Sequence, residues 1–269
     1  MSHATTDLWR YRGLVGNFAR RELKAKYKGS VLGWAWSLLN PLATLTVYAV
    51  IFGFFLRFTP TTAGNGKSNF AISLFTALVV WNFFFAVATG SMSALVGAGP
   101  LLRKIYFPPF VPVAGNAAGT LVQTGIEFGL LLVVYLLWGN IGWTIVFVPL
   151  LLALLAGFAF GIGLVLALLN ARFRDMAYIV QVVLNLLFYS APIVYPISLV
   201  QQRYRTVPWA RIYEWNPLTR FIEAFRDALY SLRAPDAGWL LYLGAISLGV
   251  LVAGWWYFQR GAADVSEEL

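Results

Sequence analysis

Apolar residues along this chain gather into six long blocks, with polar residues collected between them. Each block is long enough to cross about 30 Å of hydrocarbon at ~1.5 Å per residue, so each predicts a membrane-spanning helix. The expected spans are Val31–Leu56, Phe70–Val96, Phe110–Trp138, Ile141–Leu169, Ala177–Tyr195 and Trp239–Phe258. Since no linker separates them, we expect one all-α membrane domain over residues 1–269.

A different pattern precedes the first span, in residues 8–28. One side of a helix drawn through this segment carries Leu8, Tyr11, Val15, Phe18 and Ala19. The other side is polar and mostly basic, with Arg10, Asn17, Arg20, Arg21, Lys24 and Lys28. Basic residues opposite aromatic and aliphatic ones are typical of an amphipathic helix on the cytoplasmic membrane surface, and we predict such an interface helix here.

The fifth block ends abruptly at two prolines, and a short amphipathic helix follows it. Pro192, Tyr195 and Pro196 mark the break. Asn216 and Pro217 are a favourable pair for a helix start, because Asn accepts free amide bonds and Pro has no N–H to satisfy there. The apolar stripe that follows is Leu218, Phe221, Ile222, Phe225, Leu229 and Leu232, and Arg226 lies off it. We predict re-entrant gate helices over residues 196–233; the alternative is an ordinary polar loop containing one helix.

Polar side chains recur at helical spacing within three of the spans. They are Ser37, Asn40, Thr44 and Tyr48 in the first, Asn116, Thr120, Gln123 and Glu127 in the third, and Tyr178, Gln181, Asn185 and Tyr189 in the fifth. Such stripes either bond neighbouring helices to one another or face a hydrated path, and both interpretations stay open. Glu127 is the one acid within a span, where a charge costs ~2.5–3.5 kcal/mol on insertion scales unless it is partnered, protonated or wet.

Composition and charge narrow the class of protein. Of the 269 residues, 59% are hydrophobic and 12% charged, which fits a helical membrane protein. There is no Cys and the one His is His3, so disulfides, Cys/His metal sites and His-based catalysis within the fold are excluded. The net charge of +9 suits anionic lipid and requires no nucleic acid. No apolar segment of the signal-peptide type occupies the first thirty residues.

The distribution of Lys and Arg predicts the orientation. An even number of spans places both termini on one side, and that side holds twelve basic residues against eight on the other. The excess predicts cytoplasmic termini. Gly66-Lys67-Ser68 resembles the end of a phosphate-binding loop, but position 61 is Thr where that loop needs Gly, so we expect no nucleotide site. Candidate close-packing pairs at GxxxG spacing are Gly115–Gly119, Gly125–Gly129 and Gly157–Gly161.

Short motifs in a fixed order extend this interpretation along nearly the whole chain. They are RRELK at 20–24, YKGSVLG at 27–33, NP at 40–41, RKIYFP at 103–108, SAPIVYP at 190–196, NPL at 216–218 and FR at 225–226. Together they resemble the membrane subunit of ATP-binding-cassette polysaccharide exporters, the permeases of O-antigen, capsule and teichoic-acid type. The family usually has Ser before the first Pro of the fifth-span break, where this chain has Ala191.

The resemblance implies a homodimer of six-span subunits in the bacterial plasma membrane, paired with two separate ATPase subunits that hold ATP and Mg. It implies that this chain itself is no enzyme and that its cargo is a lipid-linked glycan. The implied ATPase-docking residues are Arg20, Arg21, Lys24, Leu101, Arg103, Lys104 and Tyr106. The implied path-lining residues, in the first and fifth spans, are Trp36, Asn40, Thr44, Tyr48, Tyr178, Gln181, Asn185 and Tyr189.

Two other classes of function stay open from the residues. An exporter of drugs or lipids with the same fold would have a mainly aliphatic path. An integral-membrane enzyme would use Glu127 or Asp175 as an acid and would act without any ATPase.

Overall fold

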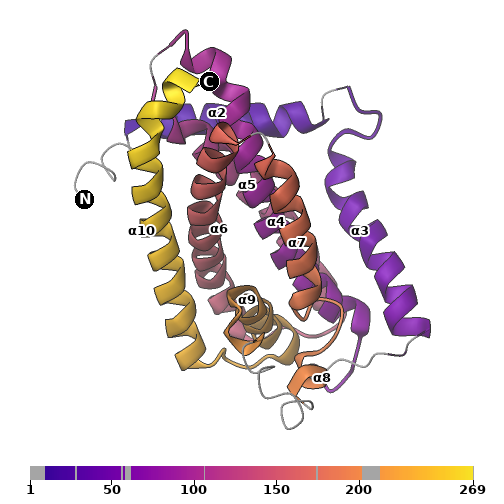
Figure 1. Ribbon diagram of the computed structural model, residues 1–269. Helices are drawn as coiled ribbons and strands as arrows, with labels where there is room; N and C mark the ends of the chain where they lie inside the picture. The colour runs from indigo at the N-terminus through magenta and orange to yellow at the C-terminus, as the bar shows by residue number, and fades with distance from the viewer. Residues whose placement is uncertain are drawn as a thin grey trace.

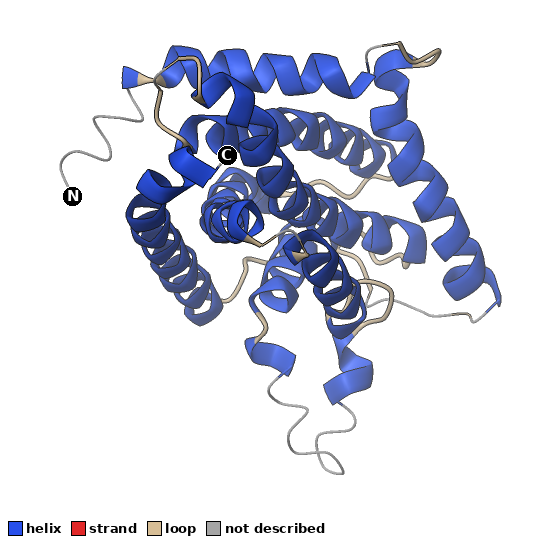
Figure 2. Ribbon diagram, turned by 45° about the horizontal axis from the view of Figure 1, so that its top comes forward, coloured by secondary structure: helices blue, strands red, loops and turns tan. Residues whose placement is uncertain are grey.

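The computed structural model describes residues 10–27, 29–55, 57, 62–105, 107–173, 175–201 and 213–268. Within these residues the chain forms helices and no strand (Figure 2). In chain order they are α2 (Arg12–Tyr27), η1 (Gly33–Ala35), α3 (Trp36–Tyr48), η2 (Ala49–Phe55), α4 (Phe70–Leu102), α5 (Phe110–Leu137), η3 (Trp143–Val146), α6 (Phe147–Arg172), α7 (Met176–Ser190), α8 (Ile197–Gln201), α9 (Pro217–Arg226), η5 (Asp227–Ser231) and α10 (Ala237–Glu268).

The long helices run back and forth between two ends of a bundle (Figure 1). α2 lies across one end, where the C-terminal part of α10 also lies; we call this the α2 end. α8 and α9 lie at the opposite end, which we call the α9 end. α3 stands at one side of the bundle in both views (Figures 1 and 2).

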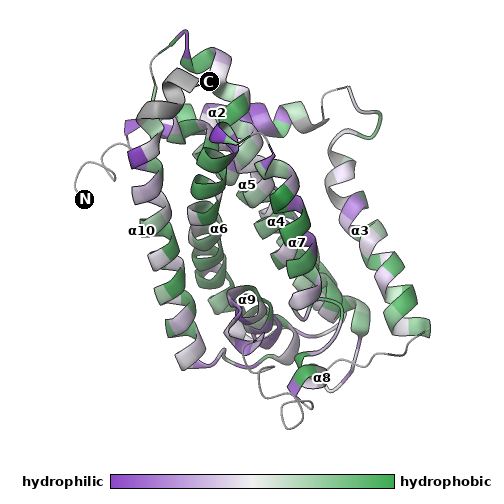
Figure 3. Cartoon of the chain, in the orientation of Figure 1, coloured by the Kyte–Doolittle hydropathy of each residue, from purple (hydrophilic) through white to green (hydrophobic). Residues whose placement is uncertain are grey.

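Four of the six predicted spans are long and apolar enough to cross a membrane as continuous helices. They are Phe70–Leu102, Phe110–Leu137, Trp143–Arg172 and Ala237–Ala262. The first and fifth predicted spans correspond to shorter apolar helices, Leu39–Phe55 and Met176–Ser190. α6 is mostly green in Figure 3, whereas α2 and α9 carry purple residues. The chain is therefore a multi-pass membrane protein, as the apolar blocks predict.

The fifth span is shorter than predicted, because α7 ends at Ser190 and not at Tyr195. Ala191, which precedes Pro192, is extended with φ −100° and ψ 147°. Proline disfavours the helical conformation in the residue before it, so the helix ends there. The second span extends past its predicted end to Leu102, and Ala98 and Gly99 in that extension are buried.

α4 is the centre of the packing. It contacts α3, α5, α6, α7 and α9, and most of its residues from Ile72 to Ala88 are buried. α6 packs closely along α10, because Gly161 has no side chain to separate the two helices. A Cβ atom at Gly161 would lie 2.6 Å from the carbonyl oxygen of Val250. This confirms one of the predicted close-packing positions.

α2 packs on protein through its apolar side. Phe18 and Ala19 are buried against α5, where a Cβ atom at Gly119 would lie 3.3 Å from the carbonyl oxygen of Ala19. Gly115 is likewise covered by Phe18, so this GxxxG pair is a helix contact as predicted. The pair Gly125 and Gly129 is different: both residues are exposed, and a Cβ atom at either would meet nothing within 4 Å. That expectation is wrong within this chain.

Candidate functional site

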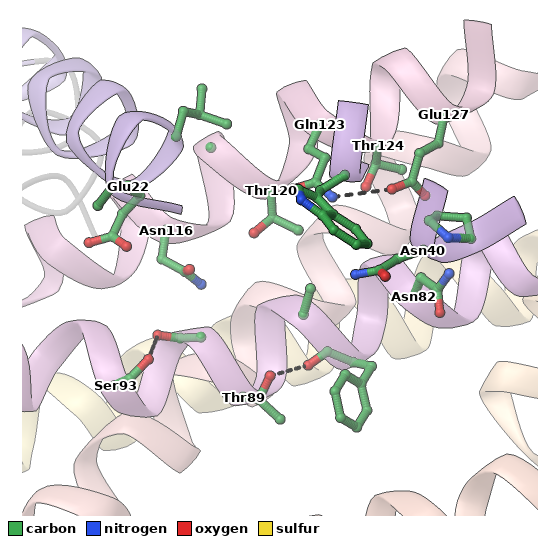
Figure 4. A pocket seen from close by; sticks show the side chains of 18 of the residues that line it. Glu22, Asn40, Asn82, Thr89, Ser93, Asn116, Thr120, Gln123, Thr124 and Glu127 are labelled. Carbon is green, nitrogen blue, oxygen red and sulfur yellow. Dashed lines mark hydrogen bonds between the residues drawn. The ribbon is translucent and has the colours of Figure 1, made fainter. Parts of the chain in front are cut away.

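A cavity of about 880 Å³ lies between α2, α3, α4 and α5 (Figure 4). Its polar lining comes from all four helices. It consists of Glu22 on α2, Asn40 and Thr44 on α3, Asn82, Thr89 and Ser93 on α4, and Asn116, Thr120, Gln123, Thr124 and Glu127 on α5. Such a concentration of amides, hydroxyls and carboxylates among apolar helices identifies the cavity as the candidate site.

The polar stripe of the third span faces this cavity. Asn116, Thr120, Gln123 and Glu127 all line it and come from successive turns of α5 (Figure 4). Glu127 is 4% exposed, and Gln123 donates a hydrogen bond of 3.2 Å to its carboxylate. The stripe predicted from spacing is therefore confirmed as one face, and the structure identifies the cavity as what that face meets.

Three of the four path-lining residues predicted in the first span lie on the opposite wall. Trp36, Asn40 and Thr44 line the same cavity, together with Pro41. Tyr48 does not: its ring stacks on Phe188 of α7, with centroids 6.0 Å apart and an interplanar angle of 28°. The side chain of Ser37 lies outside the described part of the chain. The structure thus brings together two stripes that the sequence presents separately.

The wall formed by α4 was not anticipated. Asn82, Ala86, Thr89 and Ser93 lie on one face of that helix at four- and three-residue steps. The helical spacing used for the other spans also identifies Asn82, Thr89 and Ser93 as one face, provided that Ala86 is accepted as a member of it. Gly90 also belongs to this wall. A side chain at this position would collide with the amide of Asn116. The nitrogen of that amide is buried and has no hydrogen-bond partner among the described residues.

The polar stripe of the fifth span lies elsewhere. Tyr178, Gln181, Asn185 and Tyr189 share one exposed side of α7, and none of them lines the cavity. Tyr178 is 78% and Tyr189 is 64% exposed. The structure therefore divides the predicted path-lining residues into a cavity set on α3 and an exposed set on α7.

Two of the predicted gate residues, Pro192 and Arg226, are hydrogen-bonded to each other at the α9 end. The guanidinium of Arg226 donates to the carbonyl oxygens of Pro192 at 2.7 Å, Ile193 at 3.0 Å and Ser73 at 3.4 Å. It also forms a 3.0 Å ion pair with Glu223. The proline break in the chain leaves carbonyl groups without helical partners, and a guanidinium with five N–H donors satisfies several of them at once.

The other gate residues fix the segments on either side of Arg226. Asn216 accepts from the backbone N–H of Leu218 at 3.0 Å and Pro217 follows it, so α9 begins as predicted. The Tyr195 hydroxyl donates to the carbonyl oxygen of Tyr189 at 2.7 Å and is hydrogen-bonded to Tyr213. Pro196 directly precedes α8. The apolar stripe of α9 is buried, as its spacing predicts; the assignment of residues 196–233 as re-entrant gate helices stays a prediction.

Two further features of the α9 end were not predicted. Asn140, 1% exposed, donates to the carbonyl oxygens of Leu229 and Tyr230, both at 2.9 Å, and accepts from the N–H of Asn65 at 2.8 Å. It fastens η5 to two loops of the bundle. Burial raises the pKa of Asp227 to about 6, and the Glu223 carboxylate adds to the rise while Arg233 opposes it.

The predicted docking residues lie at the α2 end. Arg20, Arg21 and Lys24 are exposed on α2, and Arg103 and Lys104 are exposed just after α4. Leu101 is half-buried, and Tyr106 lies outside the described residues. The two segments meet where the ring of Phe18 packs on Phe107, with centroids 5.6 Å apart. They therefore form one continuous region of the α2 end.

Comparison with known proteins places this geometry in context. The model of a family described as "ABC-2 type transporter" matches residues 14–230. The O-antigen export system permease protein RfbA of Myxococcus xanthus is 30% identical over 271 residues, covering 100% of both chains. RfbA of Klebsiella pneumoniae is 28% identical over 214 residues, with 77% of this chain and 76% of the relative covered. The polysialic acid transport protein KpsM of Escherichia coli is 25% identical over 237 residues, with 87% and 88% covered.

Proposed function

The chain belongs to the ABC-2 type transporter family, and from this premise we propose that it is the permease of an ATP-driven exporter of lipid-linked polysaccharide. O-antigen export and polysialic acid transport are the activities in the names of its relatives. The observation that carries the cargo assignment is the cavity, whose lining is rich in amides and hydroxyls. A polyhydroxylated cargo pairs with such groups, whereas an exporter of drugs or lipids would have a mainly aliphatic lining.

The enzyme alternative needs Glu127 or Asp175 as its acid, and the two lie in different places. Asp175 is exposed at the start of α7 and does not line the cavity that contains Glu127. The relatives are named as transport proteins, which favours a transport subunit over an enzyme that uses Glu127 or Asp175. The chain is a transport subunit, and we assign ATP hydrolysis, with its Mg, to a separate partner.

The exposed basic residues at the α2 end support a docking role. Arg20, Arg21, Lys24, Arg103 and Lys104 face away from the core. Because Phe18 and Phe107 join the two segments, a push on either would reach α2, which also contributes Glu22 and Leu23 to the cavity wall. ATP-driven closure of two partner subunits would in this way move the cavity wall.

We assign six spans to the chain, with α3 and α7 as the first and fifth. α3 has 13 residues and η2 has 7, about 30 Å at ~1.5 Å per residue. α7 has 15 residues, and the buried segment Ala191–Val194 extends its course. The basic residues at the α2 end favour a cytoplasmic position for that end of the bundle in the bacterial plasma membrane. In cells, an impermeant thiol reagent should label Lys67→Cys without permeabilisation. Labelling only after permeabilisation would show that the chain has the opposite orientation.

We also assign a homodimer, because one side of α7 has no covering helix within the described chain. Ile179, Val182, Val183 and Leu186 are exposed there beside the polar stripe. A second subunit facing this side would enclose Tyr178, Gln181, Asn185 and Tyr189 between the two copies. The cargo would then pass along α7 toward the gate at the α9 end.

Disruption of the gene in its host tests the proposal. Surface polysaccharide should be lost while its lipid-linked form accumulates inside, and the intact gene should restore export. Reversing the charge at Arg103 and Lys104 should reduce co-purification of the ATPase or uncouple its hydrolysis from export. If the disrupted strain had normal surface polysaccharide and lost drug or lipid efflux instead, the assignment of polysaccharide as the cargo would be rejected.

A further inference from the structure

The connection between α5 and α6 has an apolar outer surface. We call residues 136–150, from the end of α5 through η3 to the start of α6, the α5–α6 turn. The sequence has no charged residue anywhere between Glu127 and Arg172. Every exposed residue of the turn is apolar or glycine, and the larger ones are Leu136, Leu137, Ile141, Trp143, Val146 and Leu150. A connection that ends in water normally exposes polar residues, so this surface requires another explanation.

The polar side chains of the turn are directed into the protein. Asn140 and Thr144 supply its only amide and hydroxyl groups, and they are 1% and 0% exposed. Asn140 donates to the carbonyl oxygens of Leu229 and Tyr230, and Thr144 donates to that of Ala228 at 2.5 Å. All three acceptors belong to η5, so the inner side of the turn is bonded to the segment that follows α9.

The backbone of the turn is also hydrogen-bonded within the chain. The N–H groups of Gly139 and Asn140 donate to carbonyl oxygens in the last turn of α5, at 3.1 and 2.9 Å. The carbonyl oxygen of Trp138 accepts from the side-chain amide of Asn65 at 3.1 Å. Non-helical backbone is tolerated at membrane depth only where protein satisfies its polar groups, and these bonds meet that condition.

Other segments at the α9 end expose charge instead. Lys67 precedes α4, and Arg233 and Asp236 lie between η5 and α10; all three are exposed. The apolar surface of the turn continues the exposed apolar sides of α5 and α6, which include Val133 at 50% exposure. Trp143, 69% exposed, adds an aromatic ring of the kind found at membrane boundaries. Since both helices cross the membrane, lipid is the partner that this continuous surface fits.

We propose that the α5–α6 turn is a lipid-contacting surface that lies within the bilayer leaflet at the α9 end. Leu137, Ile141 and Val146 contact acyl chains, and Trp143 lies at the boundary with the headgroups. Because the inner side of the turn is bonded to η5, the end of α9 is supported by a connection that lies in lipid and not in water. This lipid contact is independent of the cargo and of the side of the membrane that the α9 end faces.

The absence of Cys allows single nitroxide labels to report the surroundings of the turn in the full-length protein in lipid nanodiscs. Ile141→Cys and Val146→Cys place labels on the turn. Lys67→Cys and Arg233→Cys are the water-exposed controls at the same end, and Leu248→Cys, 63% exposed within the span of α10, is the lipid control. Electron paramagnetic resonance measures collisions of each label with oxygen, which concentrates in the bilayer, and with a water-soluble nickel chelate. The ratio of oxygen to nickel collisions should be severalfold higher at positions 141 and 146 than at 67 and 233, and should approach that at 248.

Two outcomes would overturn the proposal. A ratio at positions 141 and 146 equal to that at 67 would place the turn in water. Low collision rates with both reagents would show that a protein, such as a second copy of the chain, covers the turn instead of lipid. If either labelled variant fails to assemble, Leu136→Cys and Leu150→Cys at the two ends of the turn repeat the measurement. These readouts use neither transport nor cargo, so rejection of polysaccharide export would leave them unchanged.

Discussion

α7 ends at the proline break and α9 bonds to that break through Arg226, yet the apolar helix of the two is exposed and the charged one is buried. α7 has no charged residue, and only Val180 and Leu184 are buried along it. α9 carries three charged residues, and its side chains from Leu218 to Ile222 are all buried. In a membrane protein an exposed apolar side chain meets lipid at little cost, so apolar character does not require burial within the chain. Charge is buried where it has partners.

Those partners are visible in α9. Arg226 serves the carbonyl oxygens at the break, and Arg220 lies 3.3 Å from Glu214 with its guanidinium 3.4 Å from the centroid of the Trp239 ring. The charged side chains of α9 thus contact segments that precede the helix in the chain and a residue that follows it. The polar side chains of α7 are exposed and available to another molecule. The α9 end is consequently held together by contacts within one chain, whereas the α7 side is exposed.

The largest effect is expected from Arg226→Leu. The substitution leaves the carbonyl oxygens of Pro192 and Ile193 without their donor and Glu223 without its partner. Removing one member of a buried ionic network typically costs about 3–5 kcal/mol. Arg233→Leu, at an exposed residue just beyond η5, should change stability by less than about 0.5 kcal/mol. Unfolding in mixed detergent micelles would measure both, and equal stabilities would show that α9 is not held by Arg226.

A matched pair of leucines compares the two helices directly. Leu218 on α9 is 3% exposed and Leu186 on α7 is 68% exposed. Leu218→Ala should cost about 3 kcal/mol, because it removes buried contacts and leaves a cavity. Leu186→Ala should cost less than about 0.5 kcal/mol in the monomer. The same unfolding assay applies to both, and a larger loss for Leu186→Ala would mean that α7 is packed within the chain.

The contrast also indicates what the sequence can predict. The apolar blocks located every long helix, and Asn216-Pro217 located the start of α9, because these signals are local. The spacing rule identified which polar residues share a face on α5 and on α7. It could not identify what each face meets, since that depends on helix pairing across long distances in the chain.

Particular residues show why the remaining contacts could not be predicted from the sequence. Asn116 reaches α4 because Gly90 leaves room for its amide, and no local pattern links those two positions. Asn140 bonds to residues about ninety positions later, which hydropathy cannot reveal. For Arg226, the sequence predicts only that it lies outside the apolar stripe of α9. Its partners follow only from the orphan carbonyl groups that a proline break creates.

A smaller effect is expected from Asp227→Asn, and it should depend on pH. The pKa of Asp227 in the folded chain is about 6, above its ordinary value of 3.8, mainly because the carboxyl is buried. The contribution of this group to stability is therefore fully present below pH ~4 and is lost as pH rises through ~6. Above that pH the Asn variant should be more stable by about 1 kcal/mol, after discounting for partial exposure. Unfolding of both proteins between pH 4 and pH 8 measures the difference; a constant difference would mean that Asp227 does not titrate there.

The smallest effect on stability, and the sharpest test of the comparison, is expected on α7. Gln181 and Asn185 are exposed, so Ala at either position removes no hydrogen bond that the described chain needs. If the stripe bonds to the second subunit, each lost bond should weaken assembly by roughly 0.6 kcal/mol, and export should fall only in step. If it lines the path, the dimer and the ATPase complex should stay intact while export slows. Because the chain has no Cys, a bulky thiol adduct on Gln181→Cys or Asn185→Cys should then block export outright, and the same adduct on Trp256→Cys, exposed on α10, should not. Unchanged export with adducts at both α7 positions, in a complex that remains assembled, would remove α7 from the path and leave its polar stripe as a contact between subunits.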